Sequence, residues 1–309
     1  MQFLDVKTDF AFKKVFGSEQ SKDILIDFLN AVIDLGERSI TDLTIVDPYQ
    51  IPLLKGMKDS YVDVKAILSN KQAVIIEMQV LNVEGFEKRV LYNAAKTYST
   101  QLKKADAYDS LEPIIALTIT DFVMFEEFPA IISYWHLREK DYFIKYSDDI
   151  ELVFIELPKF TKTETELTTI ADKWVYFIKH AGELDFIPTT FREPTLLEAF
   201  DIANTAGLSE EELEIQFKRK DFIFLQKGAL EKARKEGVAQ GVAQGVAQGI
   251  AQGVAQGIAQ GIAQGIAQGQ TTEKAAIVKR LLKHGVDIHL IAATAGMSLD
   301  EVEKLKQAG

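Results

Sequence analysis

Residues 61–80 read YVDVKAILSNKQAVIIEMQV, and this stretch decides the fold. Residues 61–68 and 73–80 are two short apolar runs, and the polar residues 69–72 between them form a hairpin-type turn. The pattern therefore predicts two neighbouring strands joined as a β-hairpin.

The predicted hairpin carries two carboxylates in apolar surroundings. Alternation along a strand places Glu77 and Gln79 on one face, and Asp63 on the preceding strand can pair across the hairpin. A carboxylate within a hydrophobic strand is costly unless it is paired or bound to a metal. Asp63 and Glu77 can hold one Mg²⁺ through oxygen ligands, while Gln79 orients a water and contacts a phosphate. The alternative is that these are ordinary surface acids on amphipathic strands.

The flanking sequence predicts a mixed α/β fold. Apolar residues at helical spacing in residues 8–34 predict two helices, separated at Gly17-Ser18, and residues 84–108 predict another helix. Residues 41–46, 113–120 and 152–157 are further strand candidates. Ser209 and Glu212 form a capping box that opens a helix toward residue 236. We expect a mixed sheet with helices on both faces.

Composition narrows the possible function classes. The chain has 309 residues, 47% of them apolar, with no cysteine and a net charge of −11. Disulfides, thiol catalysis and cysteine zinc sites are excluded, and a cytoplasmic location is expected. No stretch is long and apolar enough to predict a membrane span. The acidic charge disfavours nonspecific adhesion to nucleic acid but is compatible with a metal site built from carboxylates.

The sequence divides into three parts: a globular domain over residues 1–236, a repeat over 237–270 and a tail over 271–309. The repeat consists of Gly-(Val/Ile)-Ala-Gln tetrapeptides. Four residues advance about 400° on a helix, so the Val/Ile stripe drifts about 40° per repeat. The segment is predicted to be a self-associating helix, a disordered spacer or a silk-like extended structure.

The tail resembles a helix-turn-helix unit. Ala292, Gly296 and Val302 have the spacing of that motif, and Ser298 with Glu301 forms a capping box for its second helix. The second helix is mainly acidic, which disfavours insertion among DNA phosphates. A structural or oligomerising small helical domain is therefore preferred over DNA recognition.

Several motifs together resemble one known family. The chain is similar to the Rpn-type recombination-promoting nucleases, transposase-like members of the PD-(D/E)XK nuclease superfamily. The matching pieces are residues 8–17 (TDFAFKKVFG), 58–64 (KDSYVDV), 76–79 (IEMQ), Phe86, Arg89, Tyr92, Tyr98, Gln101, Leu102 and Tyr108, residues 112–115 (EPII) and 155–160 (IELPKF).

The resemblance implies a restriction-endonuclease-like fold and a DNA endonuclease that uses Mg²⁺ or another divalent cation. Asp63 and Glu77 match the metal-binding acids of the superfamily motif, and Gln79 occupies its lysine position, which removes a positive charge. Asp9 is a candidate third metal ligand, and it is equally placed to cap the helix that follows. The resemblance further suggests a role in recombination or genome defence.

The predicted helix after the hairpin is basic. Over residues 84–104 its net charge is positive, and it can contact DNA phosphates without reading bases. The candidate DNA contacts are Lys88, Arg89, Tyr92, Lys96 and Gln101. A solvated helix face is the alternative. For the whole chain, the rival to a nuclease is a catalytically inactive DNA-binding or scaffold protein, with homo-oligomers formed through the repeat and tail in either case.

Overall fold

The computed structural model describes residues 2–36, 39–50 and 60–307. The chain divides into two compact units, Met1–Ala229 and Leu230–Gly309. Lys58 and Asp59, which belong to the family-like motifs, lie outside the described residues.

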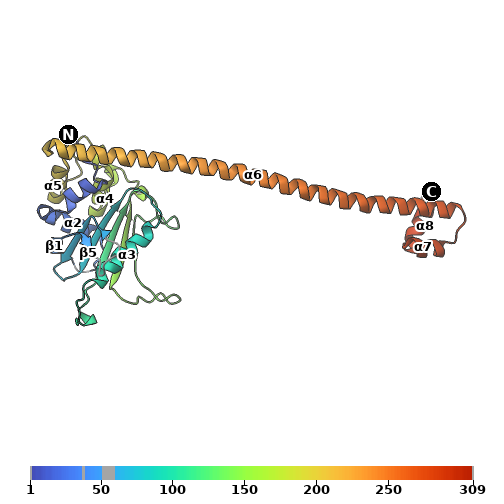
Figure 1. Ribbon diagram of the computed structural model, residues 1–309, viewed down its shortest axis with the longest axis horizontal. Coiled ribbons are helices and arrows are strands. Elements are labelled where there is room, and N and C mark those ends of the chain that lie inside the picture. The colour runs from blue at the N-terminus through green and yellow to red at the C-terminus, as the bar shows by residue number, and fades with distance from the viewer. Residues whose placement is uncertain (1, 37–38, 51–59, 308–309) are drawn as a thin grey trace. The chain divides into compact units, whose positions relative to one another are not determined.

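The first unit is built around a six-stranded mixed sheet with the order β1-β4-β5-β6-β8-β7 (Figure 1). The pairs β5–β6 and β6–β8 are parallel, and the remaining pairs are antiparallel. The strands of this sheet are β1 (Leu43–Val46), β4 (Val64–Leu68), β5 (Ala73–Gln79), β6 (Ile114–Thr120), β7 (Ile132–Trp135) and β8 (Ile150–Glu156). Strands β2 (Tyr49–Gln50) and β3 (Ser60–Tyr61) form a separate pair.

Helices cover both faces of the sheet, as the sequence predicts. The α-helices of the first unit are α1 (Asp9–Phe16), α2 (Lys22–Val32), α3 (Phe86–Ser99), α4 (Ile170–His180) and α5 (Pro194–Ala203), followed by the start of α6 (Glu210–Lys283). The 3₁₀ turns are η1 (Glu19–Ser21), η2 (Tyr108–Ser110), η3 (Leu157–Lys159), η4 (Glu164–Glu166), η5 (Ala181–Glu183) and η6 (Thr205–Gly207). The predicted break between the first two helices is confirmed at Gly17, where a Cβ would lie 2.8 Å from the carbonyl oxygen of Lys13.

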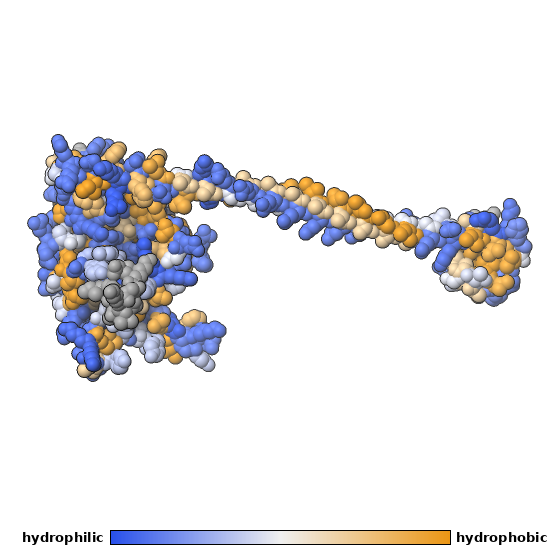
Figure 2. Space-filling view, viewed as in Figure 1, coloured by the Kyte–Doolittle hydropathy of each residue, from blue (hydrophilic) through white to orange (hydrophobic). Residues whose placement is uncertain are grey.

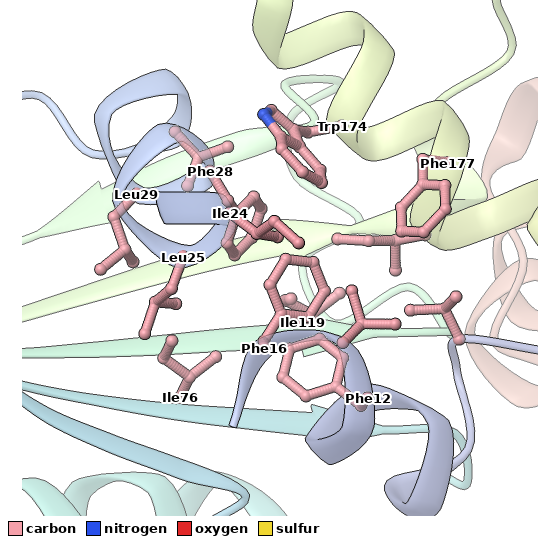
Figure 3. Packing of buried hydrophobic residues seen from close by; sticks show 14 of the residues in the cluster. Phe12, Phe16, Ile24, Leu25, Phe28, Leu29, Ile76, Ile119, Trp174 and Phe177 are labelled. Atoms are coloured by element: carbon pink, nitrogen blue, oxygen red, sulfur yellow. The ribbon is translucent and has the colours of Figure 1, made fainter. Parts of the chain in front are cut away.

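Alternation along the strands separates two hydrophobic layers. Val64 and Ile76 face the larger layer, which packs against α1, α2, α4 and α5 and includes Phe12, Phe16 and Trp174 (Figure 3). Ile75 and Ala116 face the smaller layer, which packs against Ala94 of α3. The odd-numbered positions of β5 therefore point toward α3, and this side of the sheet carries the candidate site.

The predicted hairpin is present, with one change at its start. Strands β4 and β5 pair antiparallel with Val64 opposite Ile76, and residues 69–72 form the turn. The predicted strand over 61–68 is wrong at Val62-Asp63, where the chain bends between β3 and β4. The Asp63 backbone N–H still donates to the carbonyl oxygen of Ile76, but the Met78 backbone N–H donates to the Asp63 side chain and not to a backbone carbonyl.

The helix after the hairpin is shorter than predicted. Helix α3 ends at Ser99, where the hydroxyl of Thr100 donates to the carbonyl of Lys96 at 2.8 Å. Beyond it, the Asp106 carboxylate accepts from the Lys103 backbone N–H at 2.7 Å, and Ala105 has φ of 80°. This local turn competes with helix continuation, so the helical pattern does not extend to residue 108.

The second unit contains most of α6 and the tail. Helix α6 runs through the repeat, and the Val and Ile side chains there are 56–62% exposed; Figure 2 shows these apolar residues along the helix. The tail helices α7 (Ile288–Ala295) and α8 (Leu299–Gln307) share a small core with Val278, which includes Ile291 and Val302. The predicted capping boxes form at Ser209 with Glu212 and at Ser298 with Glu301. Among the helices described, none combines the length and apolar character that crossing a bilayer requires.

Candidate active site

Asp63 is fixed at the mouth of the β4–β5 hairpin. Its backbone N–H donates to the carbonyl oxygen of Ile76 at 3.0 Å, and its Oδ2 accepts from the backbone N–H of Met78 at 2.8 Å. The Nζ of Lys13 lies 3.4 Å from Oδ1, and the Asp63 side chain is 14% exposed. Strand β5 and the Lys13 ammonium therefore hold this carboxylate in one orientation.

Glu77 and Gln79 extend from β5 toward α3, as strand alternation predicts. Arg89 of α3 donates through Nη2 to Oε1 of Glu77 and, at 2.7 Å, to Oε1 of Gln79. Asn93 donates through Nδ2 to the second Glu77 oxygen at 3.4 Å. The Gln79 Nε2 donates to the carbonyl oxygen of Leu81 at 2.6 Å. Helix α3 thus supplies polar partners to both predicted site residues of β5.

Burial disfavours the ionised form of both carboxylates. It raises the pKa of Asp63, whereas the Met78 N–H and the Lys13 ammonium act in the opposite direction. Burial likewise raises the pKa of Glu77, the Arg89 guanidinium opposes this, and the negative charge of Asp63 adds to the increase. The two acids thus lie close enough for the charge of one to oppose ionisation of the other.

Helix α1 contributes a cation and a more distant acid. Lys13 contacts Asp63, as described above. Asp9 is 40% exposed, pairs with Arg219 of α6 at 3.3 Å, and raises the pKa of Asp63 slightly through its charge. The cap of α1 is Thr8 rather than Asp9, because the Thr8 hydroxyl accepts from the Ala11 N–H. Within the described part of the chain, no three His, Cys, Asp or Glu side chains form a metal-binding group, so Asp9 does not join Asp63 and Glu77 in one.

The donor set at the hairpin fits a hard divalent cation. It offers two carboxylates and no nitrogen or sulfur ligand, and Mg²⁺ is typically held by one or two carboxylates with several waters. Asn93 adds a buried Oδ1 that has no hydrogen-bond partner. A cavity of about 10 Å³, roughly the space of one water, lies among Glu77, Asn93 and Thr118. An uncompensated acceptor and a cavity beside Glu77 are consistent with a polar ligand or water completing the site.

The structure divides the predicted DNA contacts into three groups. Lys88 and Tyr92 are exposed on α3, where a phosphate can reach them. Arg89 points into the site between Glu77 and Gln79. The last two predicted residues make contacts within the chain. The Lys96 ammonium is buried against the carbonyl of Gln50, and both ends of the Gln101 amide bond the backbone of Glu112.

The contacts that Arg89 and Asn93 of α3 make with Glu77 were not predicted from the sequence. Asn93 was not among the predicted site residues, and Arg89 was predicted only as a family-like residue and a DNA contact. Their spacing of four residues places them on one side of α3, toward the sheet. The available signal was a polar residue, Asn93, on the buried side of the helix one turn after Arg89. The sequence does not show which residue of β5 they contact, because that depends on how α3 packs against the sheet.

Comparison with known proteins agrees with this arrangement. A family model described as PD-(D/E)XK nuclease family transposase matches residues 6–233. No curated protein and no solved structure shows significant similarity to the chain. The matched region contains the whole sheet, the hairpin carboxylates and helix α3. The chain therefore belongs to the PD-(D/E)XK nuclease family transposases.

Proposed function

We propose that the protein is a metal-dependent DNA endonuclease that hydrolyses phosphodiester bonds. The observation that carries this proposal is the pair of largely buried carboxylates, Asp63 and Glu77, which lie across one hairpin and are flanked by cations of α1 and α3. Family membership supports nuclease chemistry, and the oxygen-only donor set supports Mg²⁺ or a similar ion.

The roles of the residues follow from their positions. A divalent cation held there would activate a water and stabilise charge on the phosphate. Asp63 and Glu77 would hold the cation, with the Met78 N–H keeping Asp63 oriented. Gln79 would position neighbouring groups through its two hydrogen bonds. Lys88 and Tyr92 on the exposed side of α3 would contact the DNA backbone, which positions the strand without selecting its sequence.

The repeat and tail would set the assembly state. The Val and Ile side chains of the repeat are more than half exposed, and no charged residue interrupts this stripe. Such a surface favours association with a second copy of the same helix. Two nuclease sites in one oligomer would allow both DNA strands to be cut, as a role in recombination or genome defence requires.

The test is nicking of supercoiled plasmid, because a closed circle has no ends for an exonuclease. The full chain should nick with Mg²⁺ or Mn²⁺ and not with chelator. Asp63→Asn, which keeps the shape of the side chain, should lower the rate by at least 100-fold. Asp185→Asn is the matched control, since Asp185 is exposed and outside the site. Equal cleavage by the two variants would place the active site elsewhere, and no cleavage with any metal would favour the inactive DNA-binding alternative.

A further inference from the structure

Position 79 is neutral, and the nearest cation reaches the site from another element. Hydrolysis of a phosphodiester builds negative charge on the phosphate oxygens, and a fixed positive group beside them stabilises it. Gln79 cannot supply that charge. Arg89, ten residues later on α3, has its Nη2 2.7 Å from the Gln79 Oε1.

Gln79 is oriented as an acceptor for this arginine. Its Nε2 donates to the Leu81 carbonyl at 2.6 Å, so its Oε1 is the atom that faces Arg89. A lysine at position 79 has only donors and would place a second positive charge against the guanidinium. Gln79 and Arg89 are therefore a complementary pair, in which the strand supplies the acceptor and the helix the charge.

The Arg89 side chain is anchored at one end and open at the other. Its Nε is buried, and its Cζ lies 5.1 Å from the centroid of the Phe86 ring. The side chain as a whole is nevertheless 41% exposed. A guanidinium presents several N–H donors in a planar fork that matches phosphate oxygens. Donors not used by Gln79 can thus reach a ligand that approaches from solvent.

Arg89 also occupies the carboxylate that a metal ion would need. Its Nη2 donates to Oε1 of Glu77, whose second oxygen has only the long contact to Asn93. A divalent cation at Glu77 and a guanidinium on the same oxygen repel each other. One of the two positive groups must move when the site is loaded.

We propose that Arg89 is an exchangeable counter-ion: it neutralises Glu77 in the metal-free protein and, still held by Gln79, binds the scissile phosphate when Glu77 turns to a divalent cation. This inference rests on the proposed nuclease function. It assigns to Arg89 the positive charge that is missing at position 79. It also predicts opposite effects of Arg89 on metal binding and on cleavage, which a purely structural arginine would not produce.

The first experiment measures Mn²⁺ affinity of the full chain by titration calorimetry, without DNA. Arg89→Gln, which can still donate to Glu77, should bind Mn²⁺ about tenfold more tightly than the unaltered chain because a competing charge is gone. Arg192→Gln is the charge-matched control, since Arg192 is exposed and far along the chain from the site. Its affinity should stay within twofold of the unaltered chain. Unchanged or weaker Mn²⁺ binding by Arg89→Gln would overturn the proposal.

The second experiment measures single-turnover plasmid nicking at saturating Mn²⁺. Arg89→Gln should be slower by roughly 100-fold, and Arg192→Gln should be unaffected. Adding Gln79→Lys to Arg89→Gln should restore at least tenfold of the loss, because a cation then returns to position 79. Full nicking activity in Arg89→Gln, or no rescue in the double variant, would contradict the assignment.

A third variant separates charge from folding. Arg89→Lys keeps the positive charge but loses the planar fork, so its Mn²⁺ affinity should stay near that of the unaltered chain and its nicking rate should lie between the other two. A gain of about tenfold in the Mn²⁺ affinity of Arg89→Lys would overturn the charge argument, even if Arg89→Gln unfolds. If the unaltered chain binds Mn²⁺ but does not cut DNA, the nuclease proposal fails while the affinity comparison still decides the counter-ion role. If it binds no Mn²⁺, both fail.

Discussion

At the scale of single residues, the carboxylates of the candidate site lower the stability of the fold. Asp63 and Glu77 are buried carboxylates whose raised pKa values reflect the loss of water around them. Each has one cationic partner, Lys13 or Arg89, that offsets only part of this cost. Groups kept in an unfavourable state by the fold are typical of functional sites, and their removal often stabilises a protein.

The first prediction is that Asp63→Asn raises thermal stability at neutral pH in the presence of chelator. Because the folded chain holds the Asp63 proton to a higher pH than the unfolded chain, stability falls as pH rises from about 3.9 through the folded pKa. Above that window the charge on the largely buried side chain opposes folding. The neutral amide avoids this cost, so the melting temperature at pH 7.5 should rise by about 3 °C.

Calorimetric melting curves between pH 3.5 and 8 check this sign. The gap between Asp63→Asn and the unaltered chain should close toward pH 3.5, where both side chains are uncharged. Mg²⁺ should raise the melting temperature of the unaltered chain and not of the variant, since it binds the folded state through Asp63. The exposed Asp185→Asn should show neither effect. A lower melting temperature for Asp63→Asn at pH 7.5 would refute the prediction.

Glu156 differs from the two site carboxylates, because hydrogen bonds and an ion pair offset the cost of its burial. Glu156 is completely buried, accepts from the backbone N–H groups of Met124 and Phe125, and pairs with Lys159 at 2.6 Å. The same ammonium donates to the carbonyls of Phe125 and Phe128. The Glu-x-x-Lys spacing in residues 155–160 therefore serves to fasten a loop to β8, whereas Asp63 and Glu77 leave acceptor capacity for a ligand.

At the scale of elements, the sequence predicted those features that depend on contacts between residues close together in the chain. The hairpin, the Gly17 break and the capping boxes were predictable because each depends on residues only a few positions apart. Strand β7 and helices α4 and α5 were not predicted, although Trp174 of α4 is central to the core. For the candidate site, the sequence predicted that Asp63, Glu77 and Gln79 share one hairpin, and their part in catalysis stays a prediction. The contacts of Arg89 were not predicted, because they depend on the rotation of α3 against the sheet.

The repeat within α6 gives the second prediction. Its glycines weaken a helix by about 1 kcal/mol each relative to alanine, and a Cβ at any of them meets nothing within 4 Å. Replacing Gly241, Gly245, Gly249 and Gly253 with Ala should make the helical signal at 222 nm persist to higher temperature. Glycine lets two helix backbones approach closely, and the added methyl groups would obstruct that approach. The same variant should therefore sediment at a lower mass.

Gly296→Ala is the matched control for that substitution. Gly296 ends α7 with φ of 61°, a left-handed conformation in which alanine is strained. The change should therefore destabilise the small tail core instead of stabilising a helix. A four-alanine repeat variant that keeps the full sedimenting mass would show that the glycines are not needed for self-association.

At the scale of the whole molecule, the beginning of α6 belongs to the first compact unit, Met1–Ala229, called the nuclease unit below. Glu212 pairs with Lys14 at 2.6 Å, and Lys227 pairs with Asp121 at 2.6 Å. Gln216 is buried and accepts from the Thr8 hydroxyl at 2.9 Å. These contacts explain why the compact unit extends to Ala229 instead of ending after α5.

The contacts of α6 with Asp9 and its neighbours also link this helix to the site. Arg219 pairs with Asp9, which lies one turn before Lys13 on α1, and Lys13 contacts Asp63. Since α1 contacts both α6 and the site, loss of residues 210–229 should loosen the position of Lys13. The unit boundary is therefore important for activity as well as for stability.

The third prediction compares two shortened chains. A chain of residues 1–229 should nick plasmid with Mg²⁺ at a rate per site close to that of the full protein, but it should sediment as a monomer and produce fewer double-strand breaks. A chain of residues 1–209 loses the buried Gln216 contact and three ion pairs of α6, so it should melt at least 5 °C lower and nick more slowly. Sedimentation, melting curves and the ratio of linear to nicked plasmid measure these effects. If residues 1–229 form an assembly with the same number of subunits as the full-length protein, the association surface lies within residues 1–229 and not in the repeat or tail.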